Sequence, residues 1–259
     1  MNRLKLLYLN ATFYVSFLLF SVVAIPCLSL FVAAASLLLS RRATLRRFRR
    51  AISWYGWVII HILPFPLIRV RYRDCSARKA PGPYLFVCNH RSASDPFLMA
   101  CLPHEVVQVV KAWPMHLPVL GWFARGAGYL SINEIAVEEF FAKAAKLLAD
   151  GVSIASFPEG TRSGDRRMGT FHGTVFRLAL NTRAPIVPLC ISGNERIPPR
   201  GSLALQSGTI RIHRLTAIEW QDYKDLSPFA LKTHVQETMD RELARMDGED
   251  HEDRKAPGH

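Results

Sequence analysis

The hydropathy pattern begins with an uncharged, mostly apolar stretch near the start of the chain. No charged residue occurs between Lys5 and Arg41. As one straight helix this stretch would be about 52 Å long at about 1.5 Å per residue, well beyond a hydrocarbon core of about 30 Å. We therefore expect residues 1–40 to form a hydrophobic membrane hairpin of two short helices that turn near Pro26, with one tilted span as the alternative.

Residues 41–66 combine a basic run with aromatic side chains. Six arginines fall within residues 41–50, and two tryptophans and a tyrosine follow within residues 54–57. Arginine clusters mark the cytoplasmic side of a membrane, and aromatic rings favour the headgroup region. This pattern predicts a basic, interfacial linker helix over residues 41–66. A core helix of the following domain fits the pattern equally well.

Short apolar runs alternate with amphipathic segments after this linker. The alternation predicts an α/β domain over residues 67–246, with a mixed, largely parallel sheet flanked by helices. Residues 247–259 are charged and lack periodicity, so we expect a disordered tail. The expected strands are residues 67–72, 84–88, 106–110, 128–132, 152–157, 185–191 and 209–213, and the clearest expected helices are residues 134–150, 173–181 and 227–246.

Composition and charge narrow the classes of partner. The chain has 259 residues, 49% of them hydrophobic, and a formal net charge of +12. Such a charge favours an anionic partner, and the apolar N-terminal stretch points to a phospholipid surface and away from nucleic acid. The five cysteines show no paired close spacing. We therefore expect neither a disulfide framework nor a metal site, and a reducing compartment.

Candidate chemistry first appears in the loop at residues 89–95. This loop follows the expected strand 84–88, and ligands of α/β sheets gather at the carboxyl ends of strands. His90 lies on the loop, and Asp95 follows five positions later, where the turn can fold its carboxylate back toward the imidazole. A general base and its orienting carboxylate are commonly arranged in this way. The alternative is a loop histidine that bonds its own turn, with Asp95 as a helix cap.

A second candidate loop, at residues 157–163, follows the expected strand 152–157. Gly160 permits close backbone approach, Thr161 offers a hydroxyl, and Arg162 offers a planar fork suited to a phosphate or carboxylate. Glu159 would hold an arginine or the acceptor; the alternative is that it only stabilises the loop through an ion pair with Arg162. Lys111, at the end of strand 106–110, could reach the same pocket, or could simply extend to solvent.

These residues carry a resemblance to a known family. The two loops, followed by Ile186-Val187-Pro188, occur in the order and approximate spacing of the glycerolipid acyltransferases. From about residue 85 to residue 193 the chain resembles the 1-acylglycerol-3-phosphate (lysophosphatidate) acyltransferase branch. The resemblance implies that His90 is the general base, that Asp95 orients it, and that residues 159–162 form the acceptor site. It also implies an acyl-CoA or acyl carrier protein donor and no metal.

The resemblance and the residues together predict a membrane-bound O-acyltransferase of phospholipid biosynthesis. His90 would take the proton of a lysolipid hydroxyl, which attacks the acyl thioester. The first candidate acceptor is 1-acylglycerol-3-phosphate, with phosphatidate as product. The active site would face the cytoplasm from the inner or cytoplasmic membrane. A lipid or thioester hydrolase and an inactive lipid-binding relative are the alternatives.

One position departs from the family pattern. Glu134 appears where the family usually has an arginine that helps to bind the acceptor phosphate. A carboxylate there would repel a phosphate. Either Arg125, Arg166 or Arg167 substitutes for the arginine, or the acceptor is another lysolipid, such as a lyso-aminolipid. His172 also stands where many relatives carry lysine.

Overall fold

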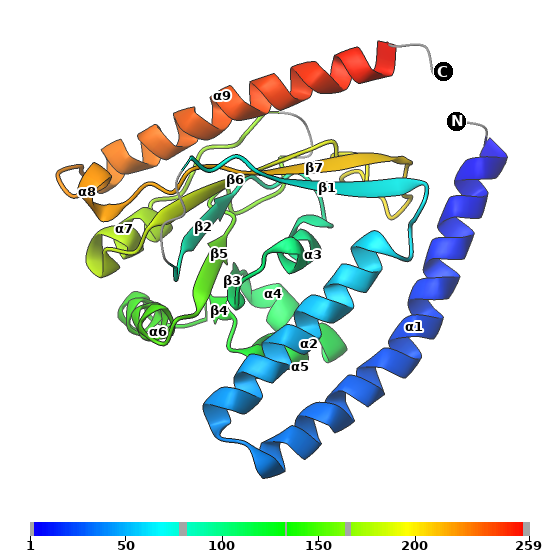
Figure 1. Ribbon diagram of the computed structural model, residues 1–259, viewed down its shortest axis with the longest axis horizontal. Coiled ribbons are helices and arrows are strands. Elements are labelled where there is room, and N and C mark those ends of the chain that lie inside the picture. The colour runs from blue at the N-terminus through cyan, green and yellow to red at the C-terminus, as the bar shows by residue number, and fades with distance from the viewer. Residues whose placement is uncertain (1–2, 78–81, 133, 164–166, 256–259) are drawn as a thin grey trace.

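A seven-stranded sheet forms the centre of the molecule (Figure 1). The structure is a computed structural model that describes residues 3–77, 82–132, 134–163 and 167–255. The strand order is β1-β7-β6-β2-β5-β3-β4. Strands β6 and β7 are antiparallel, and every other neighbouring pair among the described strands is parallel, so the predicted mixed, largely parallel sheet is confirmed. The strands are β1 (Ile68–Asp74), β2 (Leu85–Cys88), β3 (Val106–Val110), β4 (Leu130–Ser131), β5 (Ser153–Ser156), β6 (Ile186–Ser192) and β7 (Gly208–Arg214).

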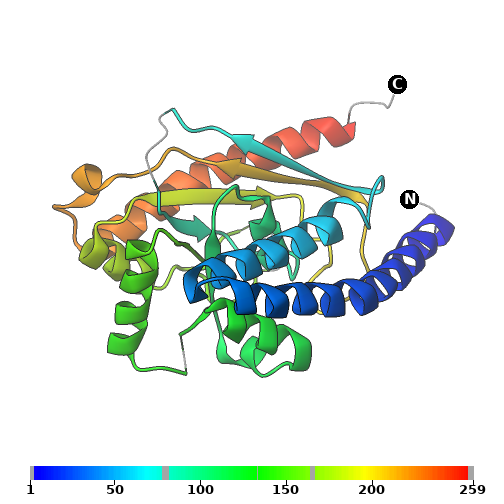
Figure 2. The same cartoon turned by 60° about the horizontal axis from the view of Figure 1, so that its bottom comes forward.

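The N-terminal hairpin turns at a different place from the predicted one. Helix α1 (Arg3–Leu38) continues through Pro26, so the predicted turn there is wrong. The chain reverses just beyond α1, and α2 (Arg41–His61) returns beside it (Figures 1 and 2). At this turn Ser40 has an extended backbone, and its side chain accepts a hydrogen bond from the amide of Ala43. A serine cap supplies the acceptor that the start of a new helix needs, whereas Pro26 removes only one donor from a long apolar helix.

Helix α1 exposes most of its apolar surface. Leu9 is buried against the domain, and Asn10 exchanges two hydrogen bonds with the backbone of Leu205. Large side chains along the rest of the helix, such as Leu18 and Val22, are exposed. By length and composition, α1 is able to cross a membrane.

Helix α2 has features of both an interfacial helix and a core helix, the two roles expected for the linker. Phe48, Ile59 and Ile60 are buried against the domain, as expected for a core helix. Trp54 and Trp57 are partly exposed, as expected for an interfacial helix. The helix therefore joins the domain to the apolar surface of α1.

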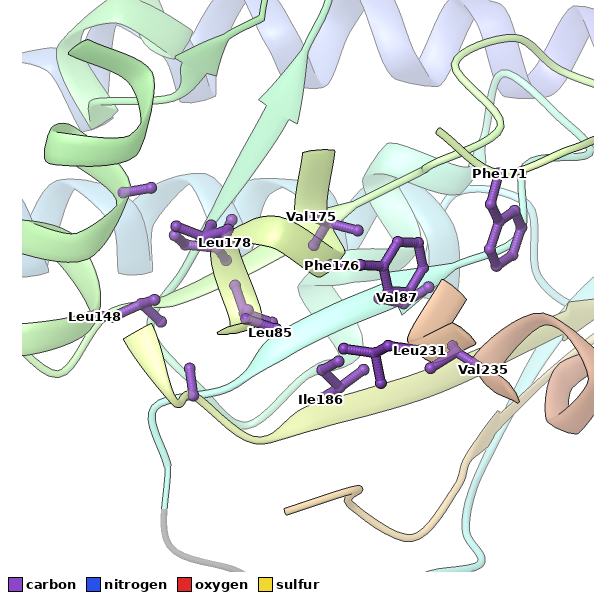
Figure 3. Packing of buried hydrophobic residues seen from close by; sticks show 14 of the residues in the cluster. Leu85, Val87, Leu148, Phe171, Val175, Phe176, Leu178, Ile186, Leu231 and Val235 are labelled. Carbon is purple, nitrogen blue, oxygen red and sulfur yellow. The ribbon is translucent and has the colours of Figure 1, made fainter. Parts of the chain in front are cut away.

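Strand β2 divides the core into two layers, because alternate side chains of a strand point to opposite faces. Leu85 and Val87 face one cluster, and Phe86 and Cys88 face the other; all four are fully buried. Figure 3 shows the first cluster, in which Leu231 of α9 also packs. Burial of such side chains stabilises the fold by roughly 1.5–3 kcal/mol each. The first layer is covered by α6 (Val137–Ala149), α7 (Thr174–Thr182) and α9 (Pro228–Lys255), which confirms the three predicted helices.

The C-terminal segment is helical where disorder was predicted. Helix α9 continues to Lys255, so the expected disordered tail is wrong for residues 247–255, and residues 256–259 lie outside the described part of the chain. The reason is a tertiary contact. The Asp247 side chain accepts hydrogen bonds from Arg91 and Ser192, which anchor this end of the helix to the sheet.

Candidate active site

The His90–Asp95 pair predicted from the sequence is formed. Strand β2 ends at Cys88, and the short helix α3 (Asp95–Leu98) begins at Asp95. The loop between them folds back, so that His90 Nδ1 lies 2.7 Å from Asp95 Oδ2. The Asp95 side chain is completely buried, while that of His90 keeps 17% exposure. The other ring nitrogen of His90, Nε2, therefore remains available on the open side.

Three further donors compensate for the burial of the Asp95 carboxylate. The backbone amides of Arg91 and Ser92 donate to Oδ2 over 2.8 and 2.9 Å. The side-chain amide of Asn194 donates to Oδ1. Asn194 was missed by the sequence reasoning. The available signal was its position just beyond the end of β6, at the same edge of the sheet as His90.

Glu159 connects the two predicted loops. Its carboxylate accepts hydrogen bonds from the backbone amides of His90 and Gly169, each over 2.7 Å. The Ser163 amide also donates to the His90 carbonyl over 2.8 Å. Burial raises the pKa of Glu159, and the two amide hydrogen bonds oppose that rise. The structure thus shows Glu159 holding the His90 loop; its contact with an acceptor stays a prediction.

Gly160 is required by the shape of its loop. Its φ angle is +66°, in the left-handed region that favours glycine. A Cβ atom there would also lie 3.1 Å from the His172 ring. Close backbone approach was the property that the sequence suggested for this position.

Buried side chains hold the two residues that flank His90. The Asn89 side chain exchanges two hydrogen bonds, of 2.9 and 2.7 Å, with the backbone of Ile191. Arg91, only 1% exposed, forms a bidentate ion pair with Asp247 of α9, with both N–O distances 2.9 Å. The position of His90 therefore depends on β6 and on the C-terminal helix.

A cavity of about 850 Å³ opens beside His90. Its wall includes Glu159, Gly160, Thr161, Arg162 and Lys111, so the predicted site residues meet in one place. Its wall also has a large apolar share, which includes Trp113, Ile132, Val137, Phe140, Phe141 and Val175.

Two further cations of the cavity wall were missed by the sequence reasoning. Arg177 lies in the first turn of α7, and Arg200 follows a pair of prolines in the loop after β6. Neither residue belongs to a local pattern that marks it as a binding residue. Together with Lys111 and Arg162 they form a set of cations suited to an anionic group, which we call the cationic rim.

Comparison with known proteins finds a similar domain. The Acyltransferase family model matches residues 69–192, a range that includes both loops. This part of the chain is therefore similar to an acyltransferase domain. The resemblance seen in the sequence is thereby confirmed.

The proteins that this chain resembles include plant enzymes. The chain is 29% identical over 160 residues to the chloroplastic 1-acyl-sn-glycerol-3-phosphate acyltransferase of Arabidopsis thaliana, covering 60% of this chain and 45% of that protein. It therefore spans less than half the length of this relative. It is 26% identical over 226 residues to the 1-acyl-sn-glycerol-3-phosphate acyltransferase of Limnanthes alba, covering 78% of this chain and 76% of that one.

A solved structure shares the fold of nearly the whole chain. The crystal structure of the 1-acyl-sn-glycerophosphate (LPA) acyltransferase PlsC from Thermotoga maritima superposes with a TM-score of 0.77 at 20% identity. The match covers 95% of this chain and 98% of that one. The similarity in fold therefore includes the N-terminal helices as well as residues 69–192.

Glu134 forms an ion pair with a surface histidine. It pairs with His116, with 2.6 Å between Oε1 and Nε2, and it is outside the set of described residues that line the cavity. Arg125 also points elsewhere, because its guanidinium donates to the Met115 carbonyl. Arg166 lies outside the described residues. Among the described residues, the lysine and arginines that line the cavity are therefore those of the cationic rim, and Arg125 is not one of them.

One cluster outside the cavity has metal-ligand chemistry. Potential ligand atoms of Cys75, His213 and Glu242 lie within 4.8 Å of one another. Arg245, however, donates to Glu242 over 2.6 Å, and its Nη2 lies 3.3 Å from His213 Nδ1. A guanidinium so close to the cluster disfavours a second cation.

Proposed function

We propose that this protein transfers a fatty acyl group from an acyl thioester to the free hydroxyl of 1-acylglycerol-3-phosphate and so makes phosphatidate. The observation that carries the proposal is the His90–Asp95 pair, which opens onto a cavity that has both apolar and cationic walls. The names of the similar plant proteins give the same reaction class. An apolar wall suits acyl chains, and a set of cations suits a phosphate.

The reaction needs one base and no enzyme nucleophile. His90 Nε2 removes the proton of the acceptor hydroxyl as the oxygen attacks the thioester carbonyl. Asp95 holds the imidazole through Nδ1 and stabilises its protonated form. The tetrahedral intermediate then expels the thiolate, which takes the proton back from His90. Base catalysis of this kind contributes about 10²- to 10⁴-fold to the rate.

The binding roles follow from the walls of the cavity. Arg162 and Lys111 would contact the acceptor phosphate, with Arg177 and Arg200 in support. The apolar residues of α6, among them Phe140 and Phe141, would contact an acyl chain. The donor carries its acyl group on a thiol of either acyl-CoA or acyl carrier protein.

The membrane arrangement completes the proposal. Helix α1 would anchor the protein in an inner or cytoplasmic membrane, and the arginines at the start of α2 would keep the domain on the cytoplasmic side. A water-insoluble acceptor would thus be reached from the surface on which it resides.

The test follows thiol release and lipid products together. Full-length protein in membranes receives acyl donor and a panel of acceptors that includes lysophosphatidate and a lyso-aminolipid. We expect phosphatidate from the first, and a loss of about 10²- to 10⁴-fold in the His90→Ala variant. His234→Ala, an exposed position on α9, is the control.

Three results would contradict the proposal. Free fatty acid without acylated lipid would indicate a hydrolase. Acylation of the lyso-aminolipid alone would move the acceptor to another class. Near-wild-type turnover by His90→Ala would reject the base.

A further inference from the structure

The helices α4 (Ala112–Met115) and α5 (Pro118–Ala127), with the turn between them, expose large apolar side chains. These side chains are between 40% and 63% exposed. Soluble proteins rarely expose apolar side chains in such a cluster, and those that do generally use it to bind a partner or a membrane. We call this cluster the α4–α5 patch; its members are Trp113, Leu117, Val119, Leu120 and Trp122.

The arrangement of α5 is the reverse of that of an ordinary surface helix. Its buried residues are the small Gly121, Ala124 and Ala127. A Cβ atom on Gly121 would come within 2.0 Å of the Met115 carbonyl oxygen, and one on Gly126 within 2.6 Å of the Phe48 ring. Where α5 packs most closely it has room only for small side chains, and large apolar ones such as Val119 and Trp122 lie on its exposed side.

The patch adjoins the helices proposed to meet the membrane. Helix α5 lies beside α2 (Figures 1 and 2), and the Trp122 and Phe123 rings contact Phe48 of α2. Helix α2 also exposes arginines, including Arg47 and Arg50. Apolar and aromatic residues next to exposed arginines match a bilayer interface that contains anionic headgroups.

The patch also reaches the cavity. Trp113 and Pro114 of α4 line the cavity beside His90, and Trp113 is at the same time a member of the patch. One continuous surface therefore leads from the outer side of α5 to the catalytic base.

We propose that the α4–α5 patch inserts into the interface of an anionic phospholipid bilayer and admits the lysolipid acceptor from that bilayer directly into the cavity. This inference rests on the proposed function, because it concerns how the same acceptor arrives. The patch is a second contact with the membrane, separate from α1. Its role is to hold the cavity mouth at the depth of the acceptor hydroxyl.

Tryptophan quenching tests the insertion itself. Full-length protein is reconstituted into vesicles that contain anionic phospholipids, with and without brominated acyl chains. The fluorescence lost in Trp122→Phe reports the patch, and that lost in Trp220→Phe reports α8, on which Trp220 packs against Tyr223. We expect bromine to quench the Trp122 component several-fold more than the Trp220 component, since only the first lies in the bilayer. Equal quenching would overturn the insertion.

An acceptor comparison tests delivery from the bilayer. The double variant Val119→Asp/Leu120→Asp is assayed with long-chain lysophosphatidate in vesicles and with a short-chain, monomeric analogue in solution. We expect about a tenfold loss with the vesicle acceptor and less than about a twofold change with the monomeric one, because only the first arrives through the bilayer. Phe229→Asp, at an exposed position of α9, is the matched control.

The outcomes separate this inference from the proposed function. Equal losses with both acceptors, or no loss with the vesicle acceptor, would overturn delivery through the patch. Disulfide-linked pairs of a Leu120→Cys variant would place a second copy of the chain on the patch and would also overturn it. Absence of acyl transfer by the wild type would reject the proposed function, while the quenching comparison would still decide insertion.

Discussion

The two sides of the cavity are built in opposite ways. On one side, the His90 loop is held by buried groups, among them Arg91 and Asp95. On the other, Lys111, Arg177 and Arg200 of the cationic rim are exposed, long side chains. Proton transfer needs a fixed geometry, whereas the attraction of an anion tolerates flexible cations. Changes on the first side should therefore reduce kcat strongly, and changes on the second should raise KM moderately.

The largest effect is expected for Asp95→Asn. The amide would face the Arg91 and Ser92 backbone amides with a donor, and it would favour the wrong tautomer of His90. We expect kcat to fall by about 10²- to 10⁴-fold with a smaller change in KM. Initial rates at saturating acceptor measure this, with circular dichroism as a check of folding. A folded variant that retains wild-type kcat would show that the pair is not catalytic.

The next effect concerns Asp247, far from His90 in sequence. In Asp247→Asn the buried Arg91 guanidinium loses its bidentate charged partner, so the unfolding free energy should fall by about 3 kcal/mol. A shift of the His90 loop should lower kcat about tenfold and leave KM nearly unchanged. Denaturant unfolding and steady-state kinetics measure the two quantities. Asp240→Asn, exposed on the same helix, should change neither; equal effects of the two variants would refute the anchoring role.

On the opposite side, Arg162→Gln should act on acceptor binding. Loss of a charge-assisted contact of about 1.5–3 kcal/mol corresponds to a rise of roughly tenfold or more in KM for lysophosphatidate. The remaining rim cations should limit the loss and leave kcat largely intact. Lys146→Gln, an exposed change on α6, controls for net charge. A fall in kcat without a change in KM would place Arg162 in the chemical step instead.

The smallest effect is expected for Glu134→Gln. Glu134 pairs with the exposed His116, and surface ion pairs contribute about 0–1 kcal/mol. We expect KM for lysophosphatidate to change by less than about twofold. The KM of the same variant for an uncharged lysolipid is measured for comparison. A large fall in KM for the phosphate acceptor alone would show that Glu134 does repel it.

Sequence reasoning was most successful where the determining contacts are local. The short apolar runs predicted each of the seven strands, and the amphipathic segments predicted the helices α6, α7 and α9. His90 and Asp95 are five positions apart, so one turn brings them together. The Gly160 loop likewise follows from backbone freedom at a single residue.

It failed where distant segments meet. Asn194 contacts Asp95, and Asp247 contacts Arg91 across 156 positions of chain. The charge pattern near Asp247 predicted disorder because a local pattern does not contain the buried arginine that anchors it. Pro26 was expected to break a helix that instead continues, with the turn at Ser40.

The sequence by itself determined the order of the elements, the apolar N-terminal segment and the chemistry of the His90 and Glu159 loops. These depend on periodicity, turn propensity and residue type, all of which act within a few positions. Only the tertiary structure decided that Glu159 holds the His90 backbone, that Arg177 and Arg200 join the cavity, and that Glu134 pairs with His116. Those outcomes depend on which strand ends and helices become neighbours, and burial of the whole core sets that arrangement.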